Sequence, residues 1–211
     1  MNRFYQVRGT SGTGKTTIAR ALMVHTNAMP SFLADKGEFD HIKKVPENKI
    51  LAYTGIIPHW DVPLVFLGNY ENTCGGCDGI PSVHIVAELL KQFNEEEDTI
   101  VFMEGLMISH MLGTVGKAQA DEFGKDGGIL AFLDTPLDVA LARIQKRRDE
   151  RGDKREFNPS NTIKDYDAVE LSRLNALRQG YRVRSIPHNN PLPTVHGHLD
   201  ALAREIKGVA G

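Results

Sequence analysis

An eight-residue segment near the start of the chain constrains the fold more than any other feature: Gly9-Thr10-Ser11-Gly12-Thr13-Gly14-Lys15-Thr16. It fits the pattern G-x-x-x-x-G-K-[ST], which forms a phosphate-binding loop (P-loop) when a strand precedes it and a helix follows it. Residues 4–7 favour a strand, and the apolar residues of 16–23 recur at helical spacing. The segment is therefore predicted to bind the phosphates of a nucleoside triphosphate.

The residue types of the loop suit an anion. Glycines allow positive φ angles and a close approach of the backbone, and the amides at a helix N-terminus point at a bound phosphate. Lys15 is expected to contact the β- and γ-phosphates and the Thr16 hydroxyl to bind Mg²⁺. The alternative is a glycine-rich turn that merely joins a strand to a helix, and the complete motif in this context favours the phosphate site. The expected nucleotide-binding residues are Gly9, Ser11, Gly12, Thr13, Gly14, Lys15, Thr16 and Thr17.

Length and composition indicate one ordinary globular domain over residues 1–211. A net charge of −2 gives no overall attraction to nucleic acid or membrane, so any nucleic-acid contact must be a local patch. No apolar run approaches the roughly 18 residues of a membrane span. Because the first strand and the P-loop begin within ten residues of the start, we expect no signal peptide and a cytoplasmic location.

Alternating strand and helix patterns predict an α/β fold, a three-layer sandwich with a central parallel sheet. Residues 28–80 form a long insertion with a hairpin around 54–61 and a short helical turn at 31–34. Continuous apolar runs at 99–103 and 129–133 are typical of buried parallel strands. The other expected strands are 4–7, 49–53, 62–68 and 181–183. One expected helix follows the P-loop and runs to about residue 27. The others cover 81–94, parts of 106–123, 137–150, 165–179 and 198–207.

The only two cysteines, Cys74 and Cys77, stand in a Cys-Gly-Gly-Cys segment. This spacing is compatible with a redox pair or with half of a zinc site, which would need two more ligands. The favoured interpretation is a tight turn whose cysteines are small packing residues.

The class of P-loop protein is narrowed by what the sequence lacks. It has no Asn-Lys-x-Asp segment and no Asp-x-x-Gly after a strand, as a GTPase would have, and it is short for a motor or an oligomeric ATPase. A small phosphotransferase remains.

Several segments resemble the nucleoside- and nucleotide-kinase-like group of P-loop kinases over most of the chain outside the insertion. They are the P-loop, 102–105 (Phe-Met-Glu-Gly), 133–136 (Leu-Asp-Thr-Pro), 143–147 (Arg-Ile-Gln-Lys-Arg) and 151–152 (Arg-Gly). The resemblance implies that Arg143 packs against adenine and that Arg147 reaches the phosphates from a lid at about 143–162, with Arg151 a further candidate. Arginine suits both tasks because it stacks on rings and bridges phosphate oxygens. The alternative is a solvated basic helix end.

A finer resemblance concerns Gly68-x-Tyr70 and residues 74–80, which are similar to phage P-loop kinases that phosphorylate 5-hydroxymethyluracil in DNA. It would explain the long insertion, since a flipped base needs a wide platform. The modest net charge counts against it, because DNA binding normally relies on basic surface.

Two carboxylates are placed for chemistry. Asp78 is the preferred catalytic base and Glu104 the preferred partner of Mg²⁺, although the two roles are interchangeable at this stage. Alternatively, Asp78 caps the following helix and Glu104 pairs with Lys15. Weaker candidates are Asp35 and Asp40 as acids, and Tyr53, Trp60 and Tyr70 as base-stacking residues, although such aromatics more often belong to a core.

The sequence thus predicts transfer of the ATP γ-phosphate to a hydroxyl, with Lys15, Asp78, Glu104 and Arg147 at the reacting centre. The preferred acceptor is the 5-hydroxymethyl group of a modified pyrimidine in DNA. Two alternatives stay open: a kinase of a free nucleotide, nucleoside or other small metabolite, and a non-catalytic ATP-binding interaction module.

Overall fold

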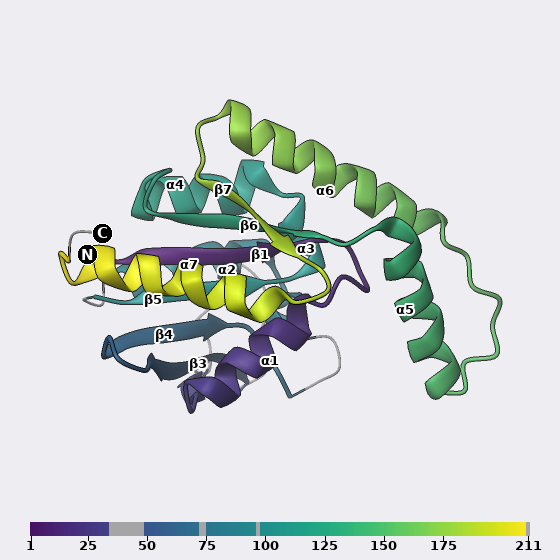
Figure 1. Cartoon of the computed structure of the whole chain (residues 1–211), viewed down its shortest axis with the longest axis horizontal. Helices are drawn as coiled ribbons and strands as arrows, with labels where there is room; N and C mark the ends of the chain where they lie inside the picture. Colours follow the sequence, from purple (N-terminus) through teal and green to yellow (C-terminus); the bar gives the residue numbers. More distant parts are fainter. Residues whose placement is uncertain (34–48, 72–74, 96–97, 210–211) are drawn as a thin grey trace.

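The computed structural model describes residues 1–33, 49–71, 75–95 and 98–209. These residues form a seven-stranded sheet through the middle of the molecule (Figure 1). Its strands are β1 (Arg3–Arg8), β2 (Met29–Leu33), β3 (Ile50–Ile57), β4 (Val62–Leu67), β5 (Ile100–Glu104), β6 (Gly128–Asp134) and β7 (Val183–Pro187). They lie in the order β2-β3-β4-β5-β1-β6-β7, so the strand before the P-loop lies between two later strands.

The sheet is parallel except at one edge. Strand β1 pairs in parallel with β5 and β6, and β4 and β7 extend this arrangement on either side. Strand β3 runs antiparallel to both β2 and β4. Every residue of β5 is buried, as expected for a central strand covered on both faces. The predicted α/β fold with a central parallel sheet is confirmed.

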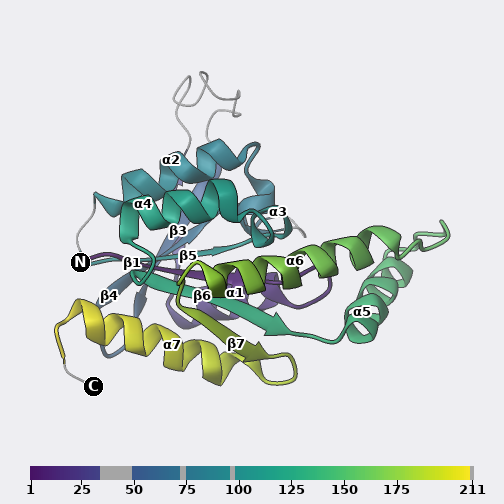
Figure 2. The same cartoon turned by 90° about the horizontal axis from the view of Figure 1, so that it is seen from above.

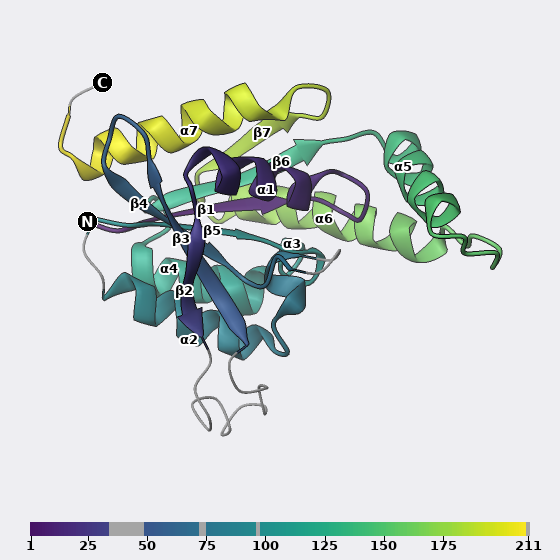
Figure 3. The same ribbon diagram turned by 90° about the horizontal axis from the view of Figure 1, so that it is seen from below.

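Helices cover both faces of the sheet. Helices α1 (Lys15–His25) and α7 (Pro191–Ile206) lie on one face, and α2 (Val83–Asn94) and α4 (Lys117–Phe123) lie on the other (Figure 3). Helix α6 (Ser160–Arg178) packs on the second face, against Phe4, Leu130 and Phe132. Figure 2 shows α5 (Leu137–Glu150) and the start of α6 projecting beyond the ends of the strands. Three short elements complete the described chain: η1 (Gly76–Gly79), α3 (Leu106–Ser109) and η2 (Leu112–Gly116).

The hairpin predicted around residues 54–61 is confirmed by β3 and β4, with His59 and Asp61 at positive φ in the turn. The helical turn predicted at 31–34 is wrong within the described residues. Residues 29–33 form β2, because they pair with β3 and Phe32 packs edge-on against Phe93. Cross-strand pairing of this kind outweighs a weak local helical signal.

Several element boundaries also differ from the sequence-based expectation. Helix α2 begins two residues after Pro81, because the Ser82 hydroxyl accepts the His84 amide and caps it. Helices α6 and α7 begin five and seven residues before the predicted starts at 165 and 198, and α7 has Pro191 in its first turn. Strand β7 begins at Val183, the residue where the predicted strand ended.

A buried arginine joins the end of β1 to both neighbouring layers. Arg8 is fully buried, and its guanidinium donates to Gln6 Oε1 (2.7 and 2.9 Å), Ser109 O (3.2 Å) and Ser172 Oγ (2.9 Å). Burial lowers its pKa to about 9. The Ser109 hydroxyl accepts the Gly9 amide in turn (3.3 Å), so this network fixes the first residue of the P-loop against α3 and α6.

In the part of the chain that the structure describes, no helix combines the length and apolar character needed to span a bilayer.

Candidate active site

The P-loop turns sharply between β1 and α1. Gly12 and Gly14 have φ angles of +79° and +104°, in the left-handed region that favours glycine. A Cβ at Gly12 would lie 2.4 Å from the Ala140 carbonyl oxygen, so the loop is pressed against α5. This contact brings Arg143 to the loop, where its Nη1 lies 3.3 Å from Thr13 O.

Lys15 is buried under the loop that precedes it. Its Nζ donates to the carbonyls of Gly9 (2.7 Å) and Thr10 (2.9 Å). Burial lowers the pKa of this ammonium, and the nearby carboxylates of Glu104 and Asp78 oppose that effect. The lysine is thus held beneath the anion site, with both acids in its electrostatic field.

Glu104 ends β5 directly beside α1. Its Oε1 accepts the Thr16 hydroxyl at 3.0 Å, while its Oε2 is buried with no hydrogen-bond partner in the described residues. Burial raises the pKa of this carboxyl to about 7, against the opposing effects of Lys15 and Thr16. The alternative of a direct Glu104–Lys15 ion pair is wrong, because the ammonium instead contacts the two loop carbonyls.

Asp78 lies in η1 at the same edge of the sheet. Its two carboxylate oxygens accept the amides of Leu106 (2.8 Å) and Met107 (3.0 Å), at the start of α3. The expectation that Asp78 caps the helix following it is wrong, since Ser82 caps α2. Asp78 therefore fastens the glycine loop to the turn after Glu104 and places the two acids close together.

The glycines of residues 68–79 are required by close packing. Gly68 and Gly76 have positive φ, and a Cβ at Gly68 would lie 2.0 Å from the Gly76 carbonyl carbon. A Cβ at Gly76 would lie 2.5 Å from Glu104 O and Oε1, and one at Gly75 would lie 2.8 Å from Thr16 Cγ2. The loop is thus wedged between the end of β5 and the P-loop helix.

These elements enclose a cavity of about 570 Å³. It brings together most of the predicted site: Ser11, Gly12, Thr13, Gly14, Lys15, Thr16, Thr17, Asp78, Glu104, Arg143 and Arg147. Gly9 contributes its carbonyl to Lys15 rather than a lining surface. Five further lining residues were not predicted: Ile18, Arg20, Leu106, His188 and Pro191.

Two of the residues that were not predicted reach the cavity in different ways. Arg20 follows Thr16 by four positions on α1, so helical periodicity could have placed it on the same face. His188 reaches the cavity after β7, where its Nδ1 lies 3.1 Å from the Asp134 carbonyl oxygen. No local sequence pattern announces that contact, because it depends on the pairing of β6 with β7.

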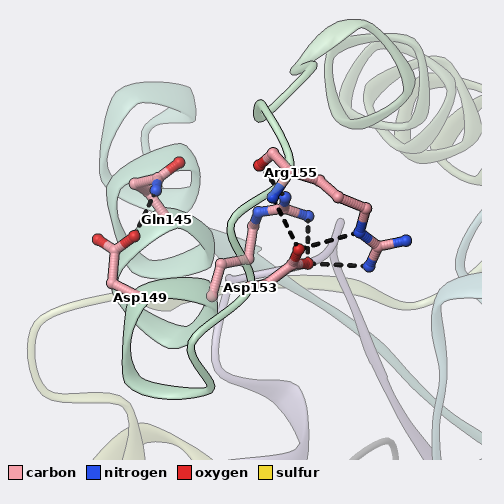
Figure 4. A network of polar contacts seen from close by, with 5 residues as sticks. Gln145, Asp149, Asp153 and Arg155 are labelled. Carbon is pink, nitrogen blue, oxygen red and sulfur yellow. Dashed lines mark hydrogen bonds and ion pairs between the residues drawn. The ribbon is translucent and has the colours of Figure 1, made fainter.

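The predicted lid at about 143–162 corresponds to the end of α5, a connection, and the start of α6. Within it Asp153 accepts Arg155 Nε at 2.9 Å (Figure 4). Asp153 also pairs with Arg148 at 3.1 Å. Both arginines hold the pKa of Asp153 below its usual range. Arg151 does not line the cavity, whereas Arg143 and Arg147 do.

The weaker candidates lie elsewhere. Tyr53 and Tyr70 are buried in the core, edge-to-face at 5.9 Å, and Trp60 donates to Asp200 Oδ1 at 3.1 Å. These contacts favour the packing interpretation of the three aromatics. Cys77 is fully buried, with its Sγ 3.7 Å from Leu67 O. Cys74, Asp35 and Asp40 lie outside the described residues.

The residues around Thr16 fit a magnesium ion. Mg²⁺ in kinase sites is usually held by one or two carboxylates, a hydroxyl, water and substrate phosphates. Thr16 and the unpartnered buried Oε2 of Glu104 supply a hydroxyl and a carboxylate at one place. Across the described ranges no group of three or more His, Cys, Asp and Glu side chains is placed to hold a metal.

The fold, the P-loop and the arginines of α5 beside it define a P-loop kinase, a phosphotransferase that takes its phosphate from ATP. No family model matches the chain. It is 33% identical over 162 residues to the 5-hmdU DNA kinase of Pseudomonas phage PaMx11, covering 76% of this chain and 77% of that protein. It is 27% identical over 210 residues to the 5-hmdU DNA kinase of Pseudomonas phage M6, covering 95% and 99%. The chain belongs to the 5-hmdU DNA kinase family, which confirms the resemblance noted in the sequence.

The chain is also similar, at low sequence identity, to two solved structures. A deoxyadenosine kinase from M. mycoides superposes with a TM-score of 0.48 at 14% identity, covering 96% of this chain and 99% of the other. A shikimate kinase from Acinetobacter baumannii gives 0.42 at 17% identity, covering 98% and 93%.

The close approach of Gly76 to Glu104 leads to a stability prediction. We expect Gly76→Ala to lower the free energy of unfolding by about 2–4 kcal/mol, because it adds a methyl group against the Glu104 backbone at a positive φ. Gly180→Ala is the matched control, since Gly180, at the end of α6, also has positive φ (+80°) but no atom near its Cβ direction. It should cost only about 1–2 kcal/mol. If urea denaturation gave the same loss of unfolding free energy for both variants, the close packing of Gly76 against Glu104 would be contradicted.

The buried carboxyl of Glu104 leads to a pH prediction. Its folded-state pKa of about 7 exceeds the usual 4.5, so the folded protein binds the proton more tightly and loses stability as pH rises through 7. We therefore expect Glu104→Gln to stabilise the metal-free protein at pH 8.5, by up to about 3 kcal/mol, and to change little near pH 4.5. Urea denaturation at both pH values measures this. Glu88→Gln, at an exposed position on α2, should show no such pH dependence. A Glu104→Gln effect that is the same at both pH values would contradict the raised pKa.

Proposed function

We propose that this protein transfers the γ-phosphate of ATP to the hydroxyl of a 5-hydroxymethyl pyrimidine in DNA. The observation that carries the proposal is the meeting of Asp78 and Glu104 with the P-loop in one cavity. A nucleotide-binding module needs only the loop, whereas two carboxylates opposite it serve an acceptor hydroxyl and a metal. The acceptor class is supported by the names of both phage relatives, and we propose the host cytoplasm as its place of action.

The donor half of the site consists of the P-loop and α5. The loop amides, Lys15 and Arg147 would neutralise the phosphates, and Arg143 would pack against the adenine. Thr16 and Glu104 would hold Mg²⁺, which when bound supplies positive charge to the β- and γ-phosphates. Arg143 already contacts the carbonyl of Thr13, and Arg147 lines the cavity close enough to lower the pKa of Lys15.

Asp78 is proposed to receive the acceptor hydroxyl. A carboxylate has about four lone-pair positions, and the Leu106 and Met107 amides occupy two of them. Those bonds hold the carboxylate in a fixed orientation while leaving acceptor capacity on the cavity side. During transfer the hydroxyl oxygen bonds to the γ-phosphorus, the bond from that phosphorus to the β–γ bridging oxygen breaks, and the hydroxyl proton passes to Asp78.

A panel of acceptors tests the function. We expect label from γ-³²P-ATP to enter an oligonucleotide that contains 5-hydroxymethyldeoxyuridine and not the same oligonucleotide with thymidine. Preferential labelling of a free nucleotide, nucleoside or other small metabolite would overturn the DNA assignment. ATP binding without transfer to any acceptor would indicate a binding module.

Replacement of the acceptor-side acid tests its role. Asp78→Asn should lower kcat by about 100-fold or more, because a positioned base contributes about that much, while the Kd for ATP stays within about threefold. Ser82→Ala is the matched control for cap loss, since it removes the cap of α2 outside the cavity. It should cost about 1 kcal/mol of stability and leave kcat unchanged. Unchanged turnover in Asp78→Asn would contradict the assignment.

A further inference from the structure

We propose that Arg20 binds a phosphodiester group of the acceptor DNA beside the target nucleotide. The inference rests on the proposed function and goes further, because it assigns the contact that distinguishes a DNA acceptor from a free nucleoside.

Arg20 lies on the same face of α1 as Thr16, one helical turn and about 6 Å further along the axis. It is exposed and lines the cavity together with Thr16 and Thr17. The positive charge of Arg20 therefore lies one helical turn further from the P-loop than Thr16 does.

The contacts of Arg20 place it on the acceptor side. Its Nη2 donates to the Tyr70 carbonyl at 3.2 Å, just before the loop that carries Asp78. The ring of Tyr70 and the methyl group of Thr16 meet at Gly75, where an added Cβ would lie 2.9 and 2.8 Å from them. Arg20 also acts electrostatically on Glu104, whose pKa its charge helps to lower. The donor-side arginines come instead from α5, across the P-loop.

The charge inventory of the cavity supports a separate role. The lysine and arginine side chains among its described lining residues are Lys15, Arg20, Arg143 and Arg147. We assign Lys15, Arg143 and Arg147 to the donor half, although Lys15 also acts electrostatically on both acids. Arg20 is the remaining cation of this set, and its charge acts on Glu104. Because the protein carries a net charge of −2, attraction to DNA must come from such local positions.

The chemistry of the side chain matches a phosphodiester. A guanidinium presents a planar set of donors that fits phosphate oxygens, and its bond to Tyr70 fixes its orientation before DNA arrives. Such preorganisation lowers the ordering cost of binding. An enzyme that acts on a base extruded from its stack also has to hold the strand next to that base.

The test compares two acceptors in the wild-type protein and in Arg20→Gln, Arg20→Lys and Arg178→Gln. One acceptor is an oligonucleotide with a single 5-hydroxymethyldeoxyuridine; the other is the free nucleoside, which has no phosphate. Arg178 is an exposed arginine at the end of α6, outside the cavity, and serves as the charge-matched control. Fluorescence anisotropy of the labelled oligonucleotide without ATP measures binding apart from catalysis.

Arg20→Gln should raise the Kd and the KM for the oligonucleotide about 10-fold or more, with kcat and the KM for ATP changed less than twofold. The slope of log Kd against log salt should fall by about 0.7–0.9, the value expected for one phosphate contact. Activity on the nucleoside should fall no more than twofold. Arg20→Lys should recover part of the oligonucleotide affinity, and Arg178→Gln should behave as the wild type.

Other outcomes overturn the inference in distinguishable ways. An equal loss of kcat on both acceptors would show that Arg20 acts on the transferred phosphoryl group. A raised oligonucleotide KM with an unchanged salt slope would show that Arg20 only holds the Tyr70 backbone in place and does not contact a phosphate. Oligonucleotide binding unaffected by Arg20→Gln would show no phosphate contact. If the wild type phosphorylates neither acceptor, or only the nucleoside, the proposed function itself fails and the Arg20 contact fails with it.

Discussion

The packing of Gly76 against Glu104 determines how the two halves of the site meet. At this point the glycine loop touches the last residue of β5, and the same loop touches Thr16 through Gly75. Asp78, two residues later, is fixed by the amides that follow Glu104 on the next turn of the chain. Because these glycines have no side chain, both acids can approach the P-loop helix closely. A steric constraint thus sets the chemistry, because it decides which polar groups share one cavity.

The electrostatics of the cavity depend on charged groups that are buried in and beneath it. Lys15 and Glu104 are both buried, and burial favours the neutral form of each side chain: it lowers the pKa of Lys15 and raises the pKa of Glu104. Each partly offsets this effect in the other, although no direct ion pair joins them. Arg8 extends the pattern beneath the loop, since its partners Gln6, Ser109 and Ser172 are all neutral. A triphosphate entering this region meets fixed positive charge in a poorly solvated setting, where charge interactions are stronger than in water.

The sequence predicted those parts of the site that depend on local patterns. The P-loop, the strand end at Glu104 and the glycine-rich surroundings of Asp78 are visible because residue type and spacing already imply backbone geometry. The capping of α3 by Asp78 and the contact of His188 with Asp134 were not predictable, because each joins segments at least 28 residues apart. Strand β2 was missed for a similar reason: its pairing with β3, rather than its own five residues, makes it a strand. The roles of Arg143 and Arg147 came from family resemblance, and the packing of Gly12 against Ala140 supplies the physical reason for their position.

The two hydrogen bonds that Lys15 makes to the carbonyls of Gly9 and Thr10 have a consequence for the shape of the loop. They join the ammonium near the end of the motif to the first two residues of the same motif, so one side chain closes the turn between β1 and α1. Because these bonds hold the backbone as well as place the charge, a substitution of Lys15 changes the geometry of the phosphate site together with its electrostatics. A loss of nucleotide binding in such a variant therefore measures both effects at once.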